Sequence, residues 1–204
     1  MAYIETIAPD DAQDEVRAMY ERQQGSWGYV PNYAKVFSHR PEVLARWGRL
    51  LAEIRRPMDA RRFELVTFAA AHELRNSACA LAHGKALTQF FPPAEVQAMA
   101  EGGDAPGLSP AERAMMDFSR KVARDATTVT QSDIDELRAC GMSDPEIFDI
   151  VATSAGRAFF TKLLDALGVL GDSPFGAMDA VLREALTVGR PLDRRTPETL
   201  NVLA

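Results

Sequence analysis

Cys79 and His83 stand four residues apart within one alanine-rich stretch, and they are the pair in this chain best suited to chemistry. On a helix, positions i and i+4 share a face, so the imidazole can reach the sulfur. A thiol reacts as its thiolate, and a neighbouring histidine can accept its proton or pair with the anion. The spacing therefore indicates a reactive cysteine with a histidine partner, without deciding which of the two roles His83 has.

The residues before this pair predict where its helix begins. Asn76 and Ser77 are good N-cap types, so we expect Cys79 in the first turn of a new helix. Unpaired N–H groups and the positive end of the helix dipole would then lower the pKa of the thiol. The plainer alternative is a small buried cysteine and an ordinary histidine.

The composition is that of a globular chain able to bury a full core. It has 204 residues, of which 47% are hydrophobic and 25% charged, with a formal net charge of −6. The basic residues are scattered among acidic ones and form no stripe, which argues against a nucleic-acid partner.

The sequence lacks the patterns of several classes of protein. The first residues lack the pattern of a signal peptide, and no run approaches the ~18 apolar residues of a membrane span, so we expect a cytoplasmic protein with no membrane partner. The two cysteines, Cys79 and Cys140, are expected to be free thiols. His72-Glu73 begins a zinc-protease-like pattern without its second histidine, and no phosphate-binding glycine loop is present. We therefore expect no metal and no cofactor.

Helix signals run through the chain. Ser109 and Ser143 each open a capping box with proline at the first helical position, Thr130 opens a short helix that ends near Cys140, and Asp59 can cap another helix. Apolar periodicity predicts further helices over 9–24 and 41–55, and no alternating run is long enough for a sheet. We predict an all-α protein, with a single domain over 1–189, its core at about 41–170, and a C-terminal arm over 190–204.

Several segments carry a resemblance to a known family. They include Glu64, the run from Cys79 to Leu87, Gly28 to Asn32, His39 to Glu42, Ser143 to Ile147, and the stretch from Ala158 to Val169. Together these resemble the carboxymuconolactone decarboxylase-like superfamily, in particular its alkyl hydroperoxidase D-like, peroxidase-related branch. The resemblance covers roughly residues 9 to 170.

The resemblance implies an all-α, multi-helical bundle that forms a homo-oligomer, a trimer or hexamer or else a dimer, with the site near a subunit interface. Peroxidase members use a Glu, then Cys-x-x-Cys, then x-x-x-His. Glu64, Cys79 and His83 fall at the glutamate, the second cysteine and the histidine, whereas Asn76 occupies the place of the first cysteine. The implied activity is a one-cysteine, thiol-dependent peroxidase with Cys79 as nucleophile and Glu64 and His83 as a proton relay.

Asn76 leaves open how an oxidised Cys79 is reduced back to the thiol. Without the first cysteine, an oxidised Cys79 needs an external thiol reductant, a partner subunit or Cys140. The implied substrate is a small molecule, an organic hydroperoxide.

Two other readings remain. One is a cofactor-independent decarboxylase that acts on a lactone acid with His83 as acid and base. Such an enzyme needs a cationic pocket for the substrate carboxylate, so one arginine should point inward; the candidates are Arg61, Arg62, Arg75 and Arg157. The other is a non-catalytic oligomeric scaffold. Arginines on helix faces are more often solvated or paired, so the sequence favours none of the four.

Overall fold

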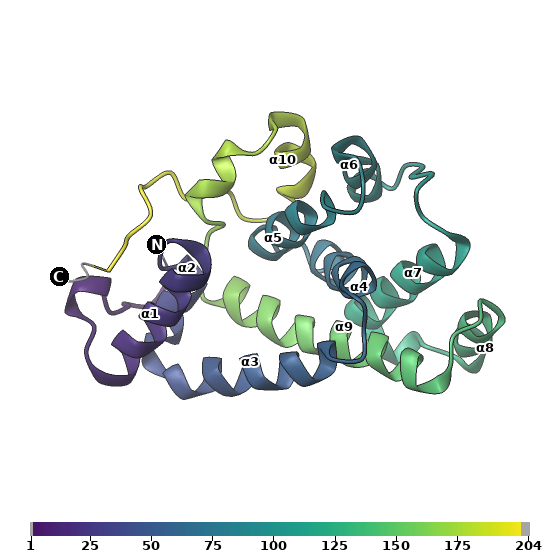
Figure 1. The fold of residues 1–204 in the computed structure, drawn as a ribbon, viewed down its shortest axis with the longest axis horizontal. Helices are drawn as coiled ribbons and strands as arrows, with labels where there is room; N and C mark the ends of the chain where they lie inside the picture. The colour runs from purple at the N-terminus through teal and green to yellow at the C-terminus, as the bar shows by residue number, and fades with distance from the viewer. Residues whose placement is uncertain (1, 201–204) are drawn as a thin grey trace.

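The computed structural model describes residues 2–200, and the regular structure in that range is helical (Figure 1). An isolated bridge between Gly171 and Leu192 is the one β-type pairing there, so the prediction of an all-α protein is confirmed. The α-helices are α1 (Asp14–Trp27), α2 (Asn32–Val36), α3 (Pro41–Arg55), α4 (Ala60–Glu73), α5 (Ser77–Leu87), α6 (Pro93–Glu101), α7 (Pro110–Asp125), α8 (Gln131–Ala139), α9 (Asp144–Ala166) and α10 (Ala180–Leu186), with short 3-10 turns at Pro9–Asp11, Phe37–His39, Ala126–Thr128 and Ser173–Ala177.

Local capping decides where most of these helices begin. Ser109, Thr130 and Ser143 each form a reciprocal capping box with the residue three positions later, as their sequences predict. Asp59 accepts a hydrogen bond from the backbone N–H of Arg62 and caps α4. The positions of these helices therefore follow from contacts within a few residues.

Helix α4 is the centre of the molecule. It is seen nearly end-on in Figure 1, with α5 to its left, α7 to its right and α9 below it. All nine residues of the run 63–71 are buried. A helix buried on every side must be apolar all round, and Glu64 is the one charged side chain in that run.

A second core forms on the side of the molecule that carries α1, α2 and α3. Tyr20, Trp47, Phe160 and Leu164 pack there, and Cys79 belongs to the same cluster. The rings of Trp47 and Phe160 stack with centroids 5.9 Å apart. Buried side chains thus extend well outside 41–170, from Ala12 at one end to Leu186 and Leu200 at the other.

The described part of the C-terminal tail lies along the chain's own N-terminal region. Asp193 donates its backbone N–H to Gly171 at 2.7 Å, and the carbonyl of Glu198 accepts the backbone N–H of Val30 at 3.1 Å. Leu200 is buried. The predicted arm therefore packs on its own subunit over 190–200, and its last residues, 201–204, lie outside the described residues. The division into one domain and an arm stays a prediction.

Candidate active site

The turn between α4 and α5 places Cys79. Arg75 takes a left-handed backbone conformation, with φ of 57°, and reverses the chain. Asn76 then caps α5, its side-chain oxygen accepting the backbone N–H of Cys79 at 2.9 Å. Cys79 therefore lies in the first turn of α5, as predicted from Asn76 and Ser77.

The environment of the thiol differs from the predicted one. Cys79 is only 5% exposed, and its backbone N–H is already used by Asn76. Burial raises the pKa of the thiol, and the positive charge of Arg157, with Nη1 3.6 Å from Cys79 Sγ, opposes that rise without overcoming it. The expectation of a lowered pKa was wrong, because burial removes the thiol from solvent and disfavours its anion.

His83 is held by Glu64, which reaches it from the neighbouring helix. Nδ1 of His83 lies 2.6 Å from Oε2 of Glu64. Burial and the charge of Arg157 lower the pKa of His83, which favours the neutral ring at neutral pH. A carboxylate only accepts hydrogen bonds, so it fixes the proton on Nδ1 and leaves Nε2 as a free base.

Cys79 and His83 line one apolar cavity of about 290 Å³. Its aromatic walls come from α1, α2, α3 and α9, namely Trp27, Tyr33, Trp47 and Phe160, and Ala78 and Ala82 add the α5 side. Such a cavity suits a small apolar molecule with few polar groups.

Arg157 is the member of this site that sequence reasoning did not single out. It comes from the middle of α9, is 5% exposed, and lines the cavity beside Cys79. Of the other three arginines considered, Arg61 pairs with Glu112, Arg62 pairs with Glu146, and Arg75 is exposed. In the sequence, Arg157 is a single arginine within the apolar run of α9. Helix periodicity alone does not show whether such an arginine is buried or lies on the surface.

Cys140 is remote from this cavity. It ends α8, which lies at the opposite end of the molecule from α1 and α2 in Figure 1. Cys79 belongs to the core beside α1 and α2, so the two thiols cannot meet without a large rearrangement.

The side chains that could bind a metal are not clustered within the described residues. Among residues 2–200, no group of three or more His, Cys, Asp or Glu side chains is placed to hold a metal ion. Over the same residues, no helix combines the length and the hydropathy needed to cross a bilayer.

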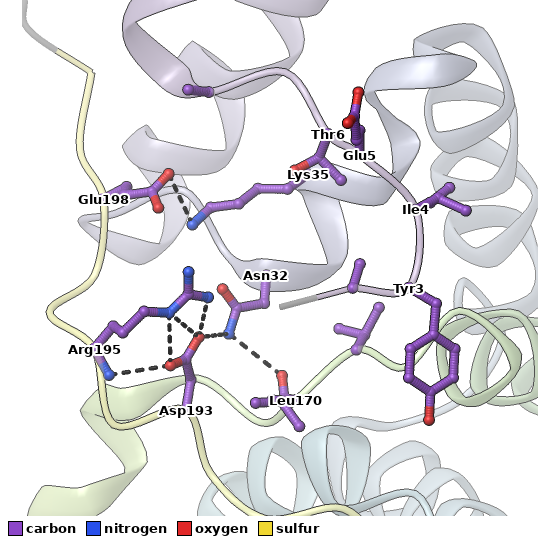
Figure 2. Close-up of a pocket in the computed structure, with 13 residues that line it drawn as sticks. Tyr3, Ile4, Glu5, Thr6, Asn32, Lys35, Leu170, Asp193, Arg195 and Glu198 are labelled. Carbon is purple, nitrogen blue, oxygen red and sulfur yellow. Dashed lines mark hydrogen bonds and ion pairs between the residues drawn. The ribbon is translucent and has the colours of Figure 1, made fainter.

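A larger cavity, of about 490 Å³, is lined in part by residues between 2 and 8 and between 193 and 198 (Figure 2). Its cations are paired: Lys35 with Glu198 at 3.0 Å, and Arg195 with Asp193 at 2.6 Å. None of its thirteen lining residues is a cysteine or a histidine. The smaller cavity beside Cys79 is therefore the better candidate for catalysis.

Solved structures share this fold. No protein-family model and no curated protein matches the chain. An uncharacterised peroxidase-related protein from Ralstonia eutropha JMP134, an alkylhydroperoxidase AhpD core, matches with a TM-score of 0.74 and 22% identity over 87% of this chain and 95% of that one. A peroxidase-related protein from Silicibacter sp. TM1040 matches with a TM-score of 0.73 and 20% identity over the same shares.

The debrominase Bmp8, solved in complex with 2,3,4-tribromopyrrole, matches with a TM-score of 0.67 and 16% identity over 91% of this chain and 98% of that one. At these identities the likeness establishes the fold. The prediction of an alkyl hydroperoxidase D-like helical fold is confirmed.

Proposed function

We propose that this chain is a thiol-dependent oxidoreductase that reduces an organic hydroperoxide at Cys79. The observation that carries the proposal is the His83–Glu64 pair, because it leaves Nε2 of His83 without the carboxylate and His83 lines the same apolar cavity as the thiol. A neutral thiol needs a base, and a neutral histidine oriented by a carboxylate is a suitable one.

The first step converts the thiol and the hydroperoxide into a sulfenic acid and an alcohol. Nε2 of His83 accepts the thiol proton as the Cys79 sulfur attacks the terminal oxygen of the hydroperoxide. The O–O bond breaks, and the protonated His83 returns the proton to the departing alkoxide. Glu64 holds the ring and stabilises its transient positive charge.

Arg157 assists the same step through its charge. Because burial disfavours the thiolate, a cation 3.6 Å from Sγ lowers the free energy of the anion that forms during attack. No bond to Arg157 is made or broken.

Of the three routes of recycling, reduction by an external thiol is the one proposed here. Asn76 replaces the cysteine that would form a disulfide with Cys79, and Cys140 is remote. Two equivalents of a small thiol reduce the sulfenic acid to the thiol, with release of one disulfide and one water.

The structural neighbours support the proposal in a general way. Two of them are called peroxidase-related, and Bmp8 binds a small aromatic ring on the same fold. The debrominase also indicates that this fold is compatible with more than one activity, so the substrate must be tested directly.

The test is the reaction of cumene hydroperoxide with the protein under single-turnover conditions, with sulfenic acid trapped by dimedone and located by mass spectrometry. We expect the adduct on Cys79, unchanged in Cys140→Ser, absent in Cys79→Ser, and formed at least about tenfold more slowly in His83→Ala. A protein whose Cys79 stays unmodified by the hydroperoxide would refute the proposal.

A carboxy-lyase that uses His83 is the second candidate, because Arg157 does turn inward. The two candidates differ in their need for sulfur. A lyase acting on a lactone acid keeps its activity in Cys79→Ser, whereas a thiol peroxidase loses all of it.

The expected homo-oligomer is also proposed. Large apolar side chains of α1, α3 and α9 are exposed, with Trp27 42%, Leu50 54% and Phe159 47% exposed, which favours burial against a second copy. Light scattering coupled to gel filtration measures the subunit number. The cytoplasmic location stays a prediction.

A further inference from the structure

Arg157 is a buried cation without an anionic partner. It is 5% exposed, yet among the described residues no carboxylate lies within ion-pair distance of its guanidinium. Its Nε has no hydrogen-bond acceptor, and its one hydrogen bond goes to the sulfur of Cys79, a weak acceptor. The guanidinium also lies over the ring of Phe160, 5.6 Å from its centroid, but a ring face does not accept the Nε–H in place of an anion. Burying a charged group without an anionic partner is costly.

The nearest acidic groups are engaged elsewhere. Asp172 lines the same cavity, but its carboxylate accepts the backbone N–H of Asn32 at 2.7 Å. Glu64 is bound to His83. Because Arg157 lines the cavity, an acceptor bound there can reach it.

We propose that this cavity binds a small aromatic or similarly flat monocarboxylate, with the carboxylate on Arg157 and the apolar body between the aromatic walls. The proposal deepens the proposed function, on which it rests for the statement that the hydroperoxide reduced at Cys79 itself carries such a carboxylate and flat apolar body. Binding itself requires only Arg157 and the walls.

The charge and shape of the cavity carry this assignment. An arginine fork pairs with a planar carboxylate through two parallel hydrogen bonds, which supply the acceptor that Nε lacks. Apart from Gln23, His83 and Asp172, the remaining lining is largely apolar. Trp47 and Phe160 stack at 16° between ring planes, and Tyr33 meets Phe160 edge-on at 5.4 Å. Such walls favour a flat ring over a small hydrated ion such as inorganic phosphate.

The two tryptophans of the chain, Trp27 and Trp47, both line the cavity, so its occupancy can be followed by intrinsic fluorescence. The protein for this test is Cys79→Ser, which removes thiol chemistry. We expect benzoate to quench or shift the emission and to bind at least about tenfold more tightly than its neutral counterpart benzamide. Acetate and inorganic phosphate, which lack an apolar body, are expected to bind more weakly than benzoate. Calorimetry provides an independent affinity.

Variants of Arg157 test whether its guanidinium is the group that binds the carboxylate. Arg157→Met should remove the preference for benzoate over benzamide, and Arg157→Lys should retain the preference at reduced affinity, because lysine keeps the charge and loses the fork. Arg49→Met, which removes an exposed arginine from cavity-lining α3, is the matched control and should leave the preference unchanged.

Equal binding of benzoate and benzamide would overturn the proposal, as would a preference that survives in Arg157→Met. If the Arg157 variants fail to fold, the wild-type protein still decides the matter, because benzoate should slow alkylation of Cys79 while benzamide and acetate at the same concentration should slow it less. An inert Cys79 together with tight benzoate binding would refute the peroxidase and leave this site standing.

Discussion

The side-chain oxygen of Asn76 accepts the backbone N–H of Cys79 at 2.9 Å, so the residue three positions before Cys79 caps the helix that carries it. The same hydrogen bond occupies an N–H group that could otherwise stabilise a Cys79 thiolate. Asn76 is 1% exposed, which makes the cap a buried one.

Replacing Asn76 with alanine should therefore destabilise the protein. The loss of a buried cap leaves the N–H of Cys79 unpaired, at a cost of roughly 1 to 2 kcal/mol in the free energy of unfolding. Urea unfolding measures it, with Asn76→Ser, which can still cap, as the control. Equal stability of the alanine and wild-type proteins would mean that the cap contributes nothing.

The alkylation rate of Cys79 should report a raised pKa. In a Cys140→Ser background, the rate with iodoacetamide should keep rising with pH through the neutral range, since the thiolate fraction there is small. Arg157→Met removes the charge that opposes the effect of burial, so alkylation should be slower at each pH. A rate that is already constant below neutral pH would contradict the buried thiol seen here.

The pKa of His83 should respond to its two charged neighbours in opposite directions. Glu64 raises it and Arg157 lowers it, against a larger lowering by burial. Titration by NMR should therefore give a lower pKa in Glu64→Gln and a higher one in Arg157→Met than in the wild type. Identical titrations in all three proteins would show that the ring does not sense these groups.

Asp172 by itself should contribute less to stability at neutral than at acid pH. Burial raises its pKa from 3.8 to about 6. Because the folded-state value is the higher one, this contribution to stability is complete below about pH 4 and is lost as the pH rises through 6. The loss is on the order of 3 kcal/mol.

Asp172→Asn removes this titration and can still accept the N–H of Asn32. Its unfolding free energy should exceed that of the wild type at pH 7, with the difference shrinking toward pH 4. A variant that is less stable at pH 7 would show that the carboxylate charge is compensated in the folded protein.

Gly189 connects the tail to the turn that places Cys79. A Cβ at this position would lie 1.9 Å from the carbonyl oxygen of Arg75, and the N–H of Gly189 donates to Ser77 Oγ at 2.8 Å. Gly189→Ala must therefore displace the tail or the α4–α5 turn, at a cost of roughly 1 to 3 kcal/mol. Thermal unfolding compares it with Gly176→Ala, whose added Cβ meets nothing within 4 Å. Equal melting temperatures for the two variants would contradict the contact.

The sequence by itself determined the helices and the pairing of Cys79 with His83 on one helix. Capping at Asp59, Asn76 and Ser109 depends on side chains within three residues of the N–H groups they bind, so local chemistry is enough to place these helix starts. Glu64 was assigned through a family resemblance, and spacing alone would not have indicated it.

Only the tertiary structure decided what surrounds the sulfur. The packing of α4 against α5 brings Glu64 to His83, and the packing of α9 brings Arg157 to Cys79 across 78 positions of the sequence. The same packing removes water from the thiol, which is why its pKa rises where the local sequence predicted a fall. Burial and long-range charge depend on distant segments that meet only in the fold, so no pattern around residue 79 could have revealed them.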